Sequence, residues 1–191
     1  MKKILIVTSM AFFAACNSST DKAKVDSMSA GTDSTATATT AMPAINSPYA
    51  IGYSSKFEIA DPKYAETVLG LWKDWDNGNL MNSKDRFADS ITLHFSNGAM
   101  IHASRDSALA MAQAERNKLA SSVSTVDAVM SVKSTDKGEN WALIWGKEVD
   151  TDKKGKVDSS ELQETWRLNK DGKADLVYQF RATFAPPKKK K

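Results

Sequence analysis

The side chains best suited to chemistry are aromatic and carboxyl groups in the second half of the chain. Five tryptophans occur, at positions 72, 75, 141, 145 and 166. Glu164 and Trp166 stand two residues apart in a predicted strand, so their side chains share one face. If Trp145 pairs near Trp166, an aromatic wall forms beside Glu164 and Tyr178, and desolvation there would let Glu164 act as an acid or base near neutral pH. The candidate pocket residues are Trp72, Trp145, Glu164, Trp166 and Tyr178, and no catalytic residue is assigned.

The competing interpretation of the same residues is structural. Tryptophans at strand and helix spacing commonly fill a core, and Glu164 would then point to water. The deciding property is which face of the last two strands points inward, because a shift of one residue exchanges the two faces. Such a shift replaces Glu164 and Tyr178 by residues of the opposite parity, namely Gln163, Arg167, Gln179 and Arg181.

Two histidines flank a predicted hairpin turn at Asn97-Gly98. His94 and His102 would face each other across that turn. A catalytic zinc needs three protein ligands, and no third ligand is evident nearby. We therefore expect neither a metal nor a cofactor at this place.

Residues 150–161, from Asp150 to Glu161, imitate a calcium-binding loop. Aspartates, a glycine and the final glutamate stand at the spacing of such a loop. Lys154, however, brings a cation to a position where a ligand oxygen belongs, and the flanking segments have the composition of strands. A charged hairpin loop is the favoured interpretation, and calcium binding is an alternative.

The elements that must position these residues form one domain, predicted over residues 56–185. Asp61-Pro62 begins a helix that ends at Gly78. The hairpin follows, and Ser104 then starts an alanine-rich helix that reaches about residue 119. Four strands end the chain. Helix, hairpin, helix and meander in this order indicate an α+β fold rather than alternating βαβ units.

The N-terminus has the layout of a secretory signal. Lys2 and Lys3 precede a mostly apolar run at residues 4–15, and Cys16 follows two alanines. The run is shorter than the ~20 residues that cross a bilayer as a helix. Residues 13–16 resemble the bacterial lipobox, which implies cleavage before Cys16 and its acylation. We therefore interpret residues 1–15 as a lipoprotein signal peptide.

Cys16 is the single cysteine of the chain, so no internal disulfide can form. An ordinary signal peptide with a chance cysteine is the alternative. Lipidation with more than one acyl chain gives stable anchoring. We expect a lipid-anchored protein of the bacterial cell envelope, bound to the bilayer through acylated Cys16, with the outer membrane favoured over the inner.

Two polar segments border the predicted domain. Residues 16–55 are rich in Ser, Thr and Ala and indicate a flexible linker. Residues 186–191 form a Lys-rich tail. The formal net charge of +3 is concentrated in that tail and in the N-terminal lysines, which leaves a slightly acidic body. Nucleic acid is therefore not an expected partner.

Three segments resemble the nuclear transport factor 2-like superfamily, and within it the SnoaL-like group. They are residues 72–78 at the end of the first helix, residues 97–106 from the hairpin into the second helix, and residues 171–174 before the last strand. The resemblance implies a cone: a curved, mostly antiparallel sheet wrapped around N-terminal helices, with an apolar cavity and often a homodimer. Enzymes of the group use an aspartate base, which no residue here matches.

We therefore consider three hypotheses for the function. The favoured one is a tethered, non-enzymatic module that binds a small apolar ligand or a protein partner. The second is an acid/base enzyme of the isomerase, cyclase or hydratase type that uses Glu164 and Tyr178. The third is calcium binding at residues 150–161.

Overall fold

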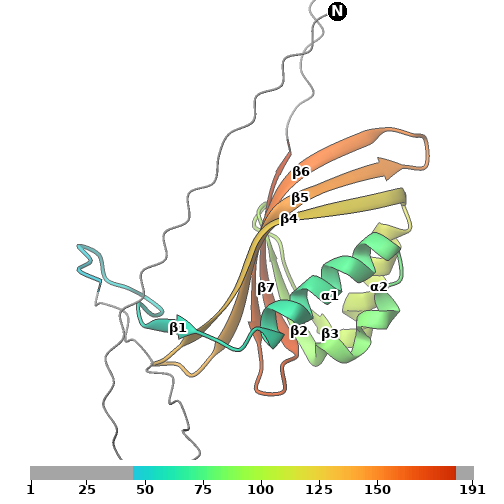
Figure 1. Ribbon diagram of the computed structural model, residues 1–191. Coiled ribbons are helices and arrows are strands. Elements are labelled where there is room, and N and C mark those ends of the chain that lie inside the picture. Colours follow the sequence, from blue (N-terminus) through green and yellow to red (C-terminus); the bar gives the residue numbers. More distant parts are fainter. Residues whose placement is uncertain (1–44, 184–191) are drawn as a thin grey trace, which may run out of the picture. The chain divides into compact units, whose positions relative to one another are not determined.

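The computed structural model describes residues 45–183, all within one compact unit. The predicted signal peptide, Cys16, most of the linker and the Lys-rich tail lie outside the described residues. Figure 1 shows the elements, which follow one another as β1 (Phe57–Ile59), α1 (Lys63–Asn77), the 3-10 helix η1 (Leu80–Arg86), β2 (Phe87–Phe95), β3 (Met100–Ser104), α2 (Arg105–Arg116), β4 (Leu119–Ser134), β5 (Asn140–Asp152), β6 (Val157–Leu168) and β7 (Ala174–Thr183).

The strands form one curved sheet in the order β1-β4-β5-β6-β7-β2-β3. All neighbouring strands are antiparallel except β2 and β7, which are parallel. Both α-helices lie on the concave side of the sheet (Figure 1), where α1 contacts β4 and β5 and α2 contacts β2 and β3. The predicted α+β architecture, a curved and mostly antiparallel sheet around N-terminal helices, is confirmed.

Local sequence signals explain where the helices begin and end. The carboxylate of Asp61 accepts a hydrogen bond from the Lys63 amide at 3.0 Å, which satisfies a free N–H of the first turn of α1. Gly78 ends the helix with a φ of 75°, a left-handed conformation that favours glycine. Ser104 caps α2 by accepting from the Ser107 amide. The predicted end of α2 near residue 119 is wrong, because Leu119 already begins the long strand β4.

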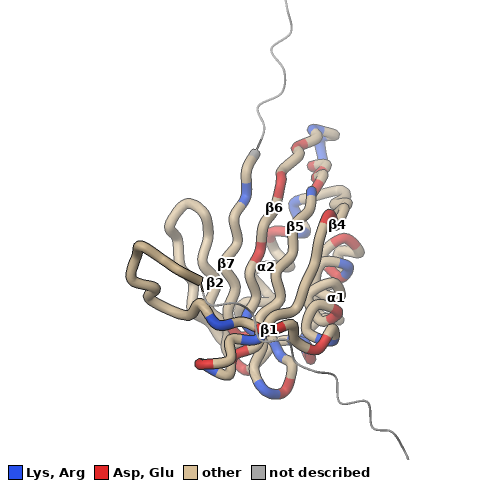
Figure 2. Tube along the Cα trace, turned by 60° about the vertical axis from the view of Figure 1, so that its left-hand side comes forward, with Lys and Arg blue, Asp and Glu red and all other residues tan. Residues whose placement is uncertain are grey.

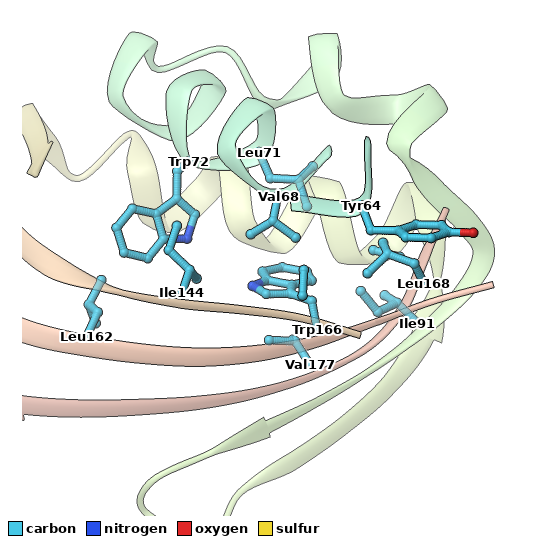
Figure 3. Close-up of a cluster of buried hydrophobic side chains, with 12 residues drawn as sticks. Tyr64, Val68, Leu71, Trp72, Ile91, Ile144, Leu162, Trp166, Leu168 and Val177 are labelled. Atoms are coloured by element: carbon cyan, nitrogen blue, oxygen red, sulfur yellow. The ribbon is translucent and has the colours of Figure 1, made fainter. Parts of the chain in front are cut away.

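Apolar side chains of α1 and of the sheet pack against one another between the helix and the strands (Figure 3). Val68 and Leu71 of α1 face Ile144, Trp166 and Val177 of the sheet. All five are nearly inaccessible to solvent. This packing fixes α1 across the sheet.

Gly146 permits the close approach of β4 and α1 to β5. A Cβ atom there would stand 2.2 Å from the Thr125 carbonyl oxygen and 3.0 Å from Cζ3 of Trp72. We expect Gly146→Ala to lower the free energy of unfolding by about 1–3 kcal/mol, since backbone must move to admit the methyl group. Urea denaturation measures this. Gly52→Ala, where nothing lies within 4 Å, is the control, and equal losses in both variants would contradict the packing argument.

Charged side chains of both signs are distributed over the domain, and the turn between β5 and β6 carries both (Figure 2). That turn is a hairpin, as predicted: the Asp152 amide donates to the Lys156 carbonyl at 2.9 Å, and the Asp152 carboxylate accepts from the amides of Lys154 and Lys156. Within residues 45–183 no group of three or more His, Cys, Asp and Glu side chains is placed to hold a metal.

Residues of the predicted linker next to β1 contact the sheet. Trp141 Nε1 donates to Tyr53 Oη at 3.1 Å, and the two rings meet edge to face with centroids 5.8 Å apart. Ser54 donates to Asp136 at 2.6 Å. Neither α-helix of residues 45–183 has the length and apolar character needed to span a bilayer.

Candidate functional site

A cavity of about 700 Å³ lies between the sheet and the helices, and some core residues, among them Ile91 and Leu162, form part of its lining. Its walls come from α1, η1 and α2 on the helical side and from strands β2 to β7 of the sheet. Most of the lining is apolar or aromatic, and includes Trp72, Trp75, Phe87, Ile91, Phe95, Leu109 and Met111. The volume is typical of small-molecule sites, which are also mostly apolar with a few placed polar groups.

One wall of the cavity is polar and consists of inward-facing residues of the last three strands. Glu148 and Asp150 are two residues apart on β5 and so share its concave face. Arg181 of β7 donates to Glu148 Oε1 at 2.8 Å and to Asp150 Oδ2 at 3.1 Å. Its Nε donates to Ser160 at 2.8 Å, and Asp150 also accepts from Ser122 at 2.6 Å. We call Glu148, Asp150 and Arg181 the acidic wall.

Burial and charge give Glu148 an unusual acidity. The pKa of the Glu148 carboxyl is raised to about 7, chiefly by burial; the neighbouring charge of Asp150 raises this pKa by more than Arg181 lowers it. The side chain is only 5% exposed. Burial by itself would lower the pKa of Arg181, but Glu148 and Asp150 hold it above its ordinary value. Near neutral pH Glu148 can therefore either give or accept a proton.

A second polar group, the carboxyl of Glu164, lies where the cavity meets the core. Glu164 Oε2 accepts from the indole N–H groups of Trp72 at 2.7 Å and of Trp166 at 2.8 Å, while Oε1 accepts from Gln179 at 2.7 Å. Glu164 is 4% exposed. Because two indole donors and an amide meet at one carboxyl group, Trp72, Glu164 and Trp166 form a fixed floor to the cavity.

The structure brings three of the five predicted pocket residues together: Trp72, Glu164 and Trp166 line the cavity. Trp145 and Tyr178 do not, and this part of the prediction is wrong. Trp145 pairs with Gln163, whose side chain has the opposite parity to Glu164. Tyr178 pairs with Thr165 and stacks on His94 outside the cone, with ring centroids 4.6 Å apart.

The predicted pairing of the two histidines is also wrong. His102 lies opposite Thr92 and its Nδ1 is 2.9 Å from Thr92 Oγ1, whereas His94 lies opposite Met100. Each histidine thus has its own partner on the outer surface of the sheet.

Sequence analysis missed the acidic wall. Glu148 and Asp150 alternate with Val149, a pattern that places two carboxyl groups on one strand face. That signal was obscured because Asp150 was counted as the first residue of the calcium-like loop. Gln179 and Arg181 were named only as the residues that a change of parity would bring inward, and they are the β7 residues that line the cavity.

No protein-family model and no curated protein matches the sequence. Solved structures do resemble the fold. An epoxide hydrolase of M. tuberculosis described as LEH-like aligns with a TM-score of 0.53 and 7% identity over 63% of this chain and 83% of that chain. The epoxide hydrolase/cyclase-like enzyme SalBIII of salinomycin pyran-ring formation gives 0.52 and 12%, over 63% and 91%. An NTF2-like protein of unknown function from Cytophaga hutchinsonii gives 0.45 and 16%, over 62% and 99%.

At these identities the likeness concerns the fold alone. The M. tuberculosis protein and SalBIII are described as enzymes, and their likeness to this chain is one of fold. The element order and the curved sheet agree with the α+β cone that the sequence resemblance implies.

Proposed function

We propose that this NTF2-like domain binds a small, mainly apolar molecule in its cone, with the polar end of that molecule against the acidic wall. The observation that carries the proposal is the cavity of about 700 Å³ with apolar walls and one hydrogen-bonded polar wall. Apolar area buried by a ligand contributes roughly 25 cal/mol per Å² before the costs of association. A few fixed polar groups then orient the molecule.

We also propose that the pocket is held at a bacterial membrane. The support for this is the sequence of residues 1–16, with its basic start, apolar run and lipobox-like end at Cys16. Acylation of Cys16 would keep the domain near a bilayer, from which apolar molecules partition. Mass spectrometry of the N-terminal peptide from native membranes tests the anchor: an unmodified Cys16, or a retained Met1, would contradict it.

Filling the cavity should abolish binding. Ala112 of α2 is half-buried and lines the cavity, whereas Ala110 on the same helix is exposed and does not. We expect Ala112→Trp to weaken the binding of octanol at least about tenfold, because the indole occupies the space of the alkyl chain, and Ala110→Trp to leave it unchanged. Calorimetric titration of both variants measures the effect. Equal affinity in the two variants would place the ligand outside the cone.

An acid/base enzyme is the second candidate, and the pKa of about 7 at Glu148 favours it. Protonated Glu148 would give its proton to an epoxide oxygen as a water molecule bonds to an epoxide carbon and the C–O bond of that carbon breaks; the added water would then return a proton to Glu148, which leaves a diol. The probe is 1,2-epoxyoctane, suggested by the structurally similar epoxide hydrolase. Diol formation should decline above pH 7 and be lost in Glu148→Gln. No diol above the buffer rate would remove this version of the enzyme hypothesis.

A further inference from the structure

We infer that the molecule bound in the cone carries a cationic amine, whose ammonium group sits against Glu148. This inference rests on the proposed function, since it specifies the chemical class of ligand for the same cavity. It follows from the balance of charge on the cavity wall, from the hydrogen bonds already made there, and from the aromatic lining.

The cavity lining has more acidic than basic groups at its polar side. Three carboxyl groups, those of Glu148, Asp150 and Glu164, line the cavity beside one guanidinium, that of Arg181. Lys118 also reaches the cavity, but its Nζ pairs with Glu115 at 2.6 Å and both side chains are about two-thirds exposed. This rim pair is screened by solvent and does not offset the buried excess of acid.

The basic group beside these carboxyls, the guanidinium of Arg181, is about one-third exposed, and each of its three nitrogens already donates one hydrogen bond. Nε of Arg181 donates to Ser160, and its two terminal nitrogens donate to Glu148 and Asp150. A ligand carboxylate would therefore meet three carboxyl groups and one guanidinium that already pairs with two of them. Glu148 Oε1 accepts a hydrogen bond from Arg181, and the Glu148 carboxyl also forms a hydrogen bond with the neighbouring Asp150 carboxyl. Two adjacent carboxyl groups suit the three donors of an ammonium group.

The aromatic lining also favours a cation. The indole N–H groups of Trp72 and Trp166 are bonded to Glu164, and that of Trp75 is bonded to Ser122 at 3.0 Å. These rings consequently offer the cavity carbon surfaces rather than donors. The negative face of an aromatic ring attracts ammonium groups, and a desolvated site strengthens that attraction. The alkyl chain of an apolar amine can therefore pack against the aromatic rings, while its ammonium group pairs with the carboxyl groups.

A matched set of probes with one alkyl chain tests the inference: octylamine, octanol and octanoate, titrated calorimetrically at pH 8. We expect octylamine to bind at least about tenfold more tightly than octanol, and octanoate to bind most weakly. Octanol binding with no preference for octylamine would overturn the amine inference and leave the proposed function standing. If none of the three binds, the proposed function fails as well.

Two variants and the pH dependence distinguish a specific contact between the ammonium group and Glu148 from nonspecific electrostatic attraction of octylamine to the protein. Glu148→Gln should remove the preference for octylamine over octanol, while the exposed Glu66→Gln should retain it. Because octylamine favours ionised Glu148, its affinity should rise about tenfold from pH 6 to pH 8. The groups facing Glu148 are Asp150, Arg181 and Glu164. A preference that survives in Glu148→Gln, or an affinity independent of pH, would overturn the inference.

Discussion

Raising the pH from 5 to 8 is expected to lower the free energy of unfolding by up to about 3 kcal/mol through Glu148 alone. The pKa of this carboxyl is about 7 in the folded protein against an ordinary 4.5, so the native state holds the proton more tightly than the unfolded chain. Stability from this group is fully present below about pH 4.5 and is lost as pH rises through 7. Each pH unit within that window costs roughly 1.4 kcal/mol.

Glu148→Gln isolates this effect from all other titrations. The variant cannot ionise at that position, so its stability at pH 8 should exceed that of the wild type, and the difference should vanish towards pH 4. Urea denaturation at pH 4, 5, 6, 7 and 8 supplies the comparison. Parallel curves for the two proteins would show that Glu148 has ordinary acidity, and the acidic wall would lose its proposed role in proton transfer.

Replacing Glu164 by leucine is expected to destabilise the domain by roughly 3–5 kcal/mol. The buried carboxyl satisfies the indole N–H groups of Trp72 and Trp166 and the amide of Gln179. Leucine leaves all three donors without that acceptor, and each unsatisfied buried donor costs about 1–3 kcal/mol. Chemical denaturation gives the loss, and a red-shifted tryptophan emission would report the disturbed floor of the cavity.

Glu164→Gln is the matched control, because glutamine keeps one acceptor oxygen at nearly the same place. Its loss of stability should be clearly smaller than that of the leucine variant. If Glu164→Leu is as stable as the wild type, the carboxyl does not organise the two tryptophans, and the fixed floor of the site must be abandoned.

Local signals in the sequence were sufficient for the outline of the fold. Asp61 and Gly78 bound the first helix, Asn97-Gly98 turns the hairpin, and Ser104 caps the second helix. Each acts within a few residues along the chain, so its effect does not depend on tertiary packing. The order of these elements then leaves few α+β arrangements.

The residues of the site could not all be predicted, because the local sequence pattern does not show which face of β7 points inward. Strand β7 carries apolar residues of both parities, among them Leu176, Val177, Tyr178 and Phe180, so alternation does not reveal its inner face. β5 likewise begins with an apolar run around Trp141 and Trp145. The register of β7 against β6, which includes an irregularity next to Leu168, decides that Gln179 and Arg181 point inward. Pairing partners set that register, and they are distant in sequence.

The sequence predicts the position of Glu164 but not the role of Glu148. Glu164 was correctly placed beside Trp166, because residues two apart on a strand share a face whatever the partner strand is. Glu148 became significant only through Arg181, a residue 33 positions away that donates to it across the intervening strand β6. A pair of this kind can be inferred only when the register of all three strands, β5, β6 and β7, is known.

The central claim is that a small apolar molecule occupies the cone, and intermolecular nuclear Overhauser effects test it most directly. Octanol is added to protein with labelled methyl groups. The account predicts contacts from the alkyl chain to the methyls of Leu109 and Leu162, both of which line the cavity. Contacts confined to Met130, which is exposed on β4, or the absence of any contact at saturating octanol would contradict it.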